Sequence, residues 1–249
     1  MDKKIAFLGT PNFAVPILKS IHQSNYKISC VFSQPPRKSN RGHKLNKSPI
    51  HLLSEELGIE IKTPENIEKE IDYIKSLNLD LAIVVAYGQI LSKDILRLSK
   101  NGFINIHASL LPKWRGAAPI QRSLINMDKI TGLSIMKINP KLDEGPVCNK
   151  YPLDILENEN AKSLSDRLSN LAAEKILSNI EKNLIFFGIE LNKINKNKFK
   201  LLSKSKYKSW VDTRGQHMGL GPTPRIKIHH LDSHRMKKKK IRRYGGPLM

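Results

Sequence analysis

The chain has 249 residues, of which 39% are hydrophobic and 26% are charged, a balance that excludes a protein disordered throughout or embedded in a membrane. Its outlying property is charge, because 43 lysines and arginines against 22 acidic residues give a net charge of +21. Such an excess favours a polyanionic partner such as nucleic acid, although an AT-rich genome that encodes lysine freely would produce the same bias.

The cysteines and the first residues of the chain bear on its location. Cys30 and Cys148 are too few for a disulfide framework and lack the spacing of a zinc site, and the histidines form no metal-binding motif. The first apolar run ends at Gly9, which is too short for a signal peptide core or a spanning helix. We therefore expect a cytoplasmic location, no membrane association and no metal.

The first hundred residues alternate between short apolar runs and segments with helical spacing, the pattern of a parallel α/β sheet. Only Gly9 lies in the turn after the first run, so the three-glycine dinucleotide fingerprint is missing and we do not expect NAD binding. The expected strands are 5–8, 28–32, 59–61, 79–86 and 102–106, and the expected helices are 13–21, 50–57, 67–77 and 90–98.

A polar, basic stretch between Gln34 and Pro49 interrupts this alternation. Its composition cannot build a core, so it is either free to meet a phosphate backbone or a solvated loop without a partner. Its basic residues are Arg37, Lys38, Arg41, Lys44 and Lys47.

Three polar residues form a candidate catalytic group. Asn105 and His107 lie two residues apart at the end of strand 102–106, so their side chains leave the same face, at the end of the sheet where ligands bind. Asp143 lies in a polar turn from which it can meet His107. Asn105 would donate to a developing oxyanion, His107 would stabilise that oxygen or pass a proton, and Asp143 would orient the histidine. The alternative is that these are ordinary polar groups, satisfied at a strand end and in a loop.

The second half of the chain changes character after residue 192. Before it we expect strands at 132–138 and 153–155 and helices at 120–125 and 164–184. Residues 201–249 hold 13 lysines and arginines against two aspartates, and a charge block of this kind is usually disordered. No serine or cysteine lies in a nucleophile elbow, which favours direct transfer between two bound substrates over a covalent enzyme intermediate.

Three segments resemble the methionyl-tRNA formyltransferases. They are Gly-Thr-Pro-Asn-Phe-Ala at 9–14, Val-Val-Ala-Tyr-Gly at 84–88 and, above all, Asn-Ile-His-Ala-Ser-Leu-Leu-Pro-Lys-Trp-Arg-Gly-Ala-Ala-Pro-Ile-Gln at 105–121. The resemblance runs in register over about residues 4–190. It implies a Rossmann-like α/β formyltransferase domain with a mostly parallel sheet at 1–191. Residues 192–249 would then be a basic linker and tail, disordered or truncated, in place of the family's C-terminal β-barrel.

The resemblance also implies an activity, which is transfer of a formyl group from the co-substrate 10-formyltetrahydrofolate to the amino group of methionine on initiator tRNA, in translation initiation. We expect a monomer whose partners are this tRNA and the folate. The family's catalytic positions correspond to Asn105, His107 and Asp143. Its folate-contacting positions correspond to Ser109, Leu110, Leu111 and Pro112. Its tRNA-contacting basic loop corresponds to Arg41, Gly42 and Lys44.

The chain departs from the family at Pro146, where a second acidic residue is common, and after about residue 200, where the landmarks of the barrel are missing. We expect a truncated or frame-shifted end that weakens formyl transfer to tRNA, the alternative being a diverged tail that binds tRNA electrostatically.

Rival functions are a glycinamide ribonucleotide or sugar-amine formyltransferase and a non-catalytic RNA-binding remnant. The run from Lys113 to Gln121 favours the tRNA enzyme over the other formyltransferases.

Overall fold

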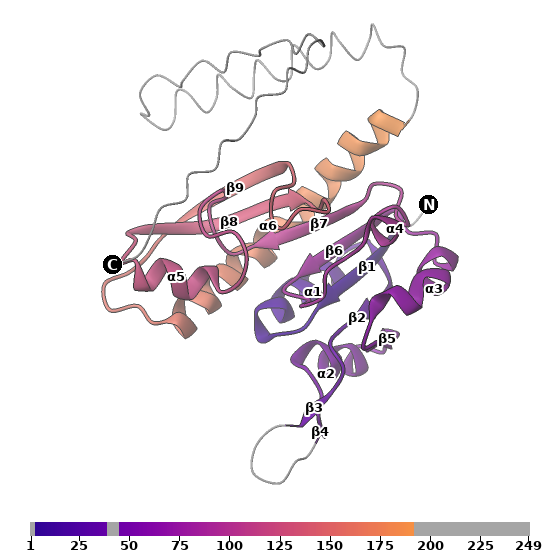
Figure 1. Ribbon diagram of the computed structural model, residues 1–249, viewed down its shortest axis with the longest axis horizontal. Helices are drawn as coiled ribbons and strands as arrows, with labels where there is room; N and C mark the ends of the chain where they lie inside the picture. The colour runs from indigo at the N-terminus through magenta and orange to yellow at the C-terminus, as the bar shows by residue number, and fades with distance from the viewer. Residues whose placement is uncertain (1–2, 39–44, 192–249) are drawn as a thin grey trace, which may run out of the picture. The chain divides into compact units, whose positions relative to one another are not determined.

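A computed structural model describes residues 3–38 and 45–191 of the chain, with side chains described as far as residue 182. Its centre is a seven-stranded sheet in the order β5-β2-β1-β6-β7-β8-β9 (Figure 1). The strands are β1 (Lys4–Gly9), β2 (Lys27–Phe32), β5 (Ile61–Lys62), β6 (Leu81–Val85), β7 (Phe103–His107), β8 (Ile130–Lys137) and β9 (Val147–Asp154). The helices are α1 (Val15–His22), α2 (Pro49–Glu56), α3 (Ile71–Ser76), α4 (Lys93–Leu96), α5 (Pro119–Ile125) and α6 (Ala161–Leu191), with short 3-10 helices η1 (Asn12–Ala14) and η2 (Ile67–Glu70).

The first five strands of this order are parallel, which confirms the predicted fold class. All five residues of β6 are buried, because helices cover both faces of the sheet and leave no strand face to water. β6 pairs with β1 on one side and with β7 on the other, and Val84 lies opposite Asn105. The carboxyl ends of β1, β6 and β7 therefore lie next to one another.

The last two strands run antiparallel, and here the sequence prediction was partly wrong. β8 pairs antiparallel with β7, and β9 pairs with β8 over its whole length instead of the short segment expected at 153–155. β9 is an edge strand whose residues are half-buried or exposed, so it lacks the continuous apolar run that marks a buried strand. Gly132 allows β9 to approach closely, since a Cβ atom there would lie 2.2 Å from the carbonyl oxygen of Tyr151.

Several element boundaries also differ from the prediction. The helix expected at 90–98 is only the single turn α4, which begins after Ser92, whose hydroxyl accepts a hydrogen bond from the Ile95 N–H. The strand expected at 59–61 is β5, shifted to Ile61–Lys62. The last helix is longer than expected, extending from Ala161 to Leu191.

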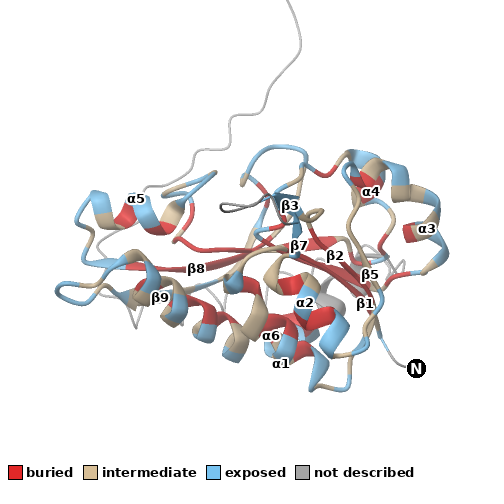
Figure 2. Ribbon diagram, turned by 90° about the horizontal axis from the view of Figure 1, so that it is seen from below, coloured by how far each residue is buried: buried red, intermediate tan, exposed pale blue. Residues whose placement is uncertain are grey.

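The helices form two layers, with α1, α2 and α6 on one face of the sheet and α3 and α4 on the other (Figure 2). Side chains alternate between these layers along each strand, so that Ile104 and Ile106 pack on the α1 and α6 side. α6 contributes a fully buried stripe at four-residue spacing, which is Leu164, Leu168, Ala172, Ile176 and Ile180. Among the described helices, α6 included, none is both long and apolar enough to cross a lipid bilayer.

Candidate active site

Asn105 and His107 lie at the carboxyl end of β7 and project from the face opposite to Ile104 and Ile106. The turn after β8 brings Asp143 against both residues. The Asn105 amide donates to Asp143 Oδ1 at 3.4 Å, and His107 Nδ1 lies 3.5 Å from Asp143 Oδ2. The side chains of His107 and Asp143 are 7% and 12% exposed. The structure therefore brings the three predicted side chains together in one cluster, largely shielded from water.

The conformation of the Asp143 turn is fixed by the chain around it. Asp143 has a left-handed φ of +47°, and its Oδ2 accepts a hydrogen bond of 2.8 Å from the Gly116 N–H. Two residues further on, a Cβ atom on Gly145 would lie 1.8 Å from the carbonyl oxygen of Lys137, so only glycine fits this close approach to β8. Pro146, where the chain departs from the family, is exposed, and its main-chain carbonyl accepts from the Lys137 N–H at 2.9 Å.

Both ring nitrogens of His107 are engaged. Nε2 lies 2.9 Å from the main-chain carbonyl oxygen of Trp114, and since a carbonyl only accepts, Nε2 carries the proton of this hydrogen bond. Nδ1 then faces the carboxylate of Asp143, and this contact is attractive only when a proton is present on one of the two groups. Nδ1 and the Asp143 carboxylate therefore form an ion pair when the ring carries a second proton.

The segment after His107, which holds the predicted folate-contacting residues, turns back beside β8. Ser109 is fully buried and its hydroxyl donates to the carbonyl of Lys113, while Leu111 is 2% exposed. Leu110 is half-buried and packs near Gly132, and Pro112 is exposed.

Ser134 ties this segment to β8, and sequence reasoning missed it. Its hydroxyl donates to the Ser109 carbonyl at 2.7 Å and accepts from the Leu111 N–H at 2.9 Å. Ser134 pairs with His107 across the two strands. No local pattern marks a serine inside a strand for such a role, because the role depends on pairing that the sequence does not reveal.

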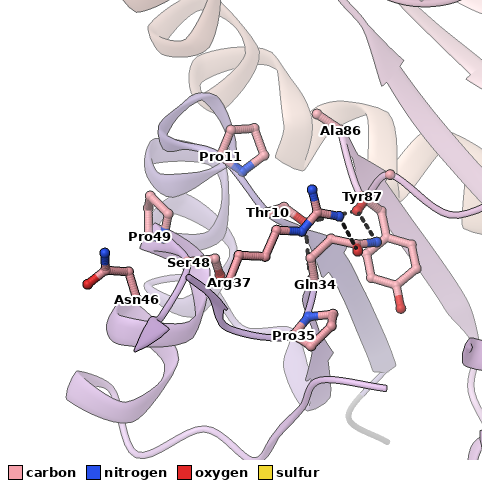
Figure 3. Close-up of a pocket in the computed structure, with 11 residues that line it drawn as sticks. Thr10, Pro11, Gln34, Pro35, Arg37, Asn46, Ser48, Pro49, Ala86 and Tyr87 are labelled. Carbon is pink, nitrogen blue, oxygen red and sulfur yellow. Dashed lines mark hydrogen bonds between the residues drawn. The ribbon is translucent and has the colours of Figure 1, made fainter. Parts of the chain in front are cut away.

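A pocket of about 390 Å³ opens at the carboxyl ends of β1, β2 and β6 (Figure 3). Its floor is organised around the Tyr87 carbonyl, which accepts from the Thr10 hydroxyl at 2.9 Å and from the Gln34 amide at 3.1 Å. The Arg37 guanidinium donates to Gln34 Oε1 at 3.2 Å and lies along the pocket. Cluster residues do not line this pocket, but Ala86 does, and it directly follows β6, the strand next to β7.

The basic stretch between Gln34 and Pro49 contains a small hairpin that the sequence analysis did not predict. Its strands are β3 (Arg37–Lys38) and β4 (Leu45–Asn46), and they extend beyond α2 (Figure 1). The predicted tRNA-binding residues Arg41, Gly42 and Lys44 lie outside the described residues. Lys47, which follows β4, forms an ion pair of 2.6 Å with Glu55, so its charge is already partnered within the chain.

Two further predictions concern the basic tail and the absence of a metal site. The basic tail after residue 192 lies outside the described residues, and the boundary at 191 stays a prediction. Within the described ranges, no three His, Cys, Asp or Glu side chains lie together where they could hold a metal ion.

Comparison with known proteins gives one consistent result. The sequence pattern of the formyl transferase family matches residues 3–180. The methionyl-tRNA formyltransferase of Pelagibacter ubique is 59% identical over 184 residues, which are 73% of this chain and 59% of that protein. The enzyme of the same name from Caulobacter vibrioides is 44% identical, over 73% of this chain and 61% of that protein. The chain thus spans about three fifths of the length of these curated relatives.

Solved structures share the fold. The phosphoribosylglycinamide formyltransferase of Anaplasma phagocytophilum superposes with a TM-score of 0.60 over 72% of this chain and 86% of that chain, at 20% identity. At that identity the likeness concerns the α/β architecture alone.

Proposed function

The chain belongs to the formyl transferase family, and from this premise we propose that it transfers a formyl group from 10-formyltetrahydrofolate to the amino group of methionine on initiator tRNA, in translation initiation in the cytoplasm. The observation that carries the proposal is the meeting of Asn105, His107 and Asp143 in one cluster that is largely shielded from water. Support for methionyl-tRNA as the acceptor comes from the relatives of that name, which match this chain at 59% and 44% identity.

The reaction needs two kinds of help from the protein. The amine nitrogen attacks the formyl carbon, the carbonyl electrons move to oxygen, and the bond from that carbon to the folate nitrogen then breaks. The oxyanion needs a hydrogen-bond donor, and a proton must leave the amine while the folate nitrogen gains one.

Asn105 supplies the donor in this proposal. Its amide has two N–H groups, and its one hydrogen bond among the described residues is the long contact with Asp143. The other N–H can point at a developing oxyanion. We assign the proton transfer to His107 and Asp143, because His107 Nδ1 faces the carboxylate at 3.5 Å and a histidine and a carboxylate are groups that exchange protons in general acid–base catalysis.

The two substrates would approach the cluster from different sides. We assign Ser109, Leu110, Leu111 and Pro112 to folate, because this segment follows His107 directly and borders β8. The acceptor end of the tRNA would enter through the pocket of Figure 3, whose lining includes Arg37 and Asn46 of the basic hairpin. Arg41, Gly42 and Lys44 would meet its phosphates, next to the exposed Arg37 and Lys38.

The test is formyl transfer from 10-formyltetrahydrofolate to charged initiator tRNA by the 249-residue chain. His107→Ala should lower kcat/KM by roughly 10²- to 10⁴-fold, the range for loss of a general acid or base. His22→Ala is the control, since His22 is exposed at the end of α1, away from the cluster, and should leave turnover unchanged. Equal turnover in His107→Ala and the parent would contradict the assignment, and tRNA binding by a parent chain without turnover would favour an RNA-binding remnant.

A further inference from the structure

We propose that Asp128 is a positioning residue for the candidate active site, acting through Trp114 on His107. The proposal deepens the proposed formyl transfer and rests on it for its kinetic readout. Its geometry is a chain of contacts that runs from the Asp128 carboxylate to the Trp114 indole and from the Trp114 carbonyl to the His107 ring.

Asp128 lies in the turn between α5 and β8, and its side chain is only 6% exposed. Its carboxylate accepts three hydrogen bonds, from Lys113 Nζ at 2.7 Å, Asn126 Nδ2 at 2.7 Å and Trp114 Nε1 at 2.8 Å. Burial opposes ionisation of the carboxyl, but these three donors outweigh burial and hold the pKa of Asp128 below its usual value. Asp128 is therefore an anion at neutral pH, the form that can accept from all three donors.

Trp114 needs such an anchor because of its backbone. Its φ is +59°, in the left-handed region that a bulky side chain rarely adopts and that persists only where surrounding contacts impose it. The Asp128 carboxylate holds the edge of the indole, and the Lys113 ammonium lies 5.2 Å from the ring centroid, over its face. Two contacts thus fix the side chain of a residue whose backbone conformation is unfavourable by itself.

The backbone held in this way contacts two members of the cluster. The Trp114 carbonyl accepts from His107 Nε2 at 2.9 Å, and the N–H of Gly116, two residues later, donates to Asp143 Oδ2 at 2.8 Å. The segment from Trp114 to Gly116 therefore sets the orientation of both His107 and Asp143. A displacement of about 1 Å at such a site lowers rates on the order of 10²-fold.

Two variants break the anchor from opposite sides. Asp128→Asn removes the negative charge, and Trp114→Phe removes the indole N–H while keeping a ring. Each should lower kcat roughly 10- to 100-fold, with a much smaller change in the KM for 10-formyltetrahydrofolate, because the substrate contacts are intact. The double variant should lose no more than the worse single variant, since both break one bond.

Asp80→Asn is the matched control for a purely structural carboxylate. Asp80 is similarly buried, at 14% exposed, and accepts from the Lys4 N–H and from Lys100 Nζ at the amino end of β6. Asp80→Asn should leave kcat unchanged. A double variant of Asp80→Asn and Trp114→Phe should therefore have the kcat of Trp114→Phe alone.

A readout independent of turnover is the ¹⁵N NMR signal of His107 Nε2, assigned by its loss in His107→Ala. It should shift in Asp128→Asn and in Trp114→Phe and stay in place in Asp80→Asn. If the folded variants keep both the parent's kcat and this signal, the positioning role is overturned. A parent chain without turnover would overturn the proposed function, while the NMR comparison would still decide the positioning role. If Asp128→Asn does not fold, Trp114→Phe decides it alone.

Discussion

Two aspartates of this fold, both largely shielded from water, are held in different ways. Asp80, at the amino end of β6, accepts hydrogen bonds of 2.9 Å from the Lys4 N–H and 3.1 Å from Lys100. Asp143 has one short bond, from Gly116, and meets Asn105 and His107 at 3.4 and 3.5 Å. The short contacts of Asp80 join neighbouring strands. The longer contacts of Asp143 are typical of catalytic groups without substrate, which tighten when the reacting molecules bind.

The backbone around the two sites differs in the same way. Near Asp80, the left-handed conformations belong to Asn78 and Gly102, residue types that adopt them readily. Around the candidate active site and its pocket they belong not only to Gly88 and Gly116 but also to non-glycine residues, which are Ala86, Trp114, Ala118 and Asp143, with φ between +47° and +59°. Alanine and tryptophan gain nothing locally from this conformation, so three residues at the candidate site and its pocket have an unfavourable backbone conformation that the surrounding structure must impose.

The largest expected effect separates the two aspartates directly. Asp143→Asn removes the charge that faces His107 and should lower kcat/KM by roughly 10²- to 10⁴-fold. Asp80→Asn should leave kcat/KM unchanged and lower the free energy of unfolding by roughly 1 to 3 kcal/mol, through weakened hydrogen bonds to a charged group. Steady-state kinetics and urea unfolding of both variants measure the contrast. Similar rate losses in the two variants would remove the distinction.

A pair of asparagines extends the comparison. Asn105→Ala should cost about 2 to 4 kcal/mol of transition-state stabilisation, the range for loss of one oxyanion donor. Asn101 is its control, since it is 7% exposed and its amide donates to the main-chain carbonyl of Asp80 at 2.8 Å. Asn101→Ala should lower the free energy of unfolding and leave kcat unchanged. A rate loss below about tenfold in Asn105→Ala would be too small for an oxyanion donor.

The smallest expected effect is the pH dependence of stability at Asp80. Burial opposes its ionisation, but the Lys4 N–H and Lys100 outweigh burial and hold the pKa of Asp80 below its usual 3.8. A lowered pKa stabilises the fold at pH values above 3.8, and this contribution disappears as the pH falls through the folded-state pKa. The difference in unfolding free energy between the parent and Asp80→Asn should therefore be constant from neutral pH to about 5 and shrink below about 4. A difference that grows on acidification would show the opposite linkage.

Sequence patterns predicted the parallel half of the sheet well, because buried strands such as β6 are continuous apolar runs bounded by turns. They also placed Asn105 and His107 on one face, a consequence of the two-residue period of a strand. They failed for β9, whose half-exposed residues carry no such run, and for the hairpin formed by β3 and β4, whose strands have two residues each.

The candidate site was predictable only in part, for a similar reason. Asn105 and His107 lie two residues apart in the sequence, and Asp143 was proposed from its place in a polar turn and then matched by the family resemblance. Ser134 and Asp128 act through hydrogen bonds to residues 14 to 25 positions away, and neither has a local pattern that distinguishes it from an ordinary strand or turn residue. Such roles depend on how β7 and β8 pair, which periodicity alone does not fix.

The packing of α6 on α1 has a consequence for the chain as it leaves the ribosome. Synthesis proceeds from the amino terminus at about 5 to 20 residues per second, so β1, β2, β6 and β7 are complete before β8 exists. The apolar face of α1, with Ile17 and Ile21, is buried against the stripe of α6 that ends at Ile180. Until that stripe has emerged, a growing chain exposes this face to water, and to any chaperone that binds exposed apolar surface. The apolar face of α1 is therefore protected from aggregation only after α6 has been synthesised and has packed against it.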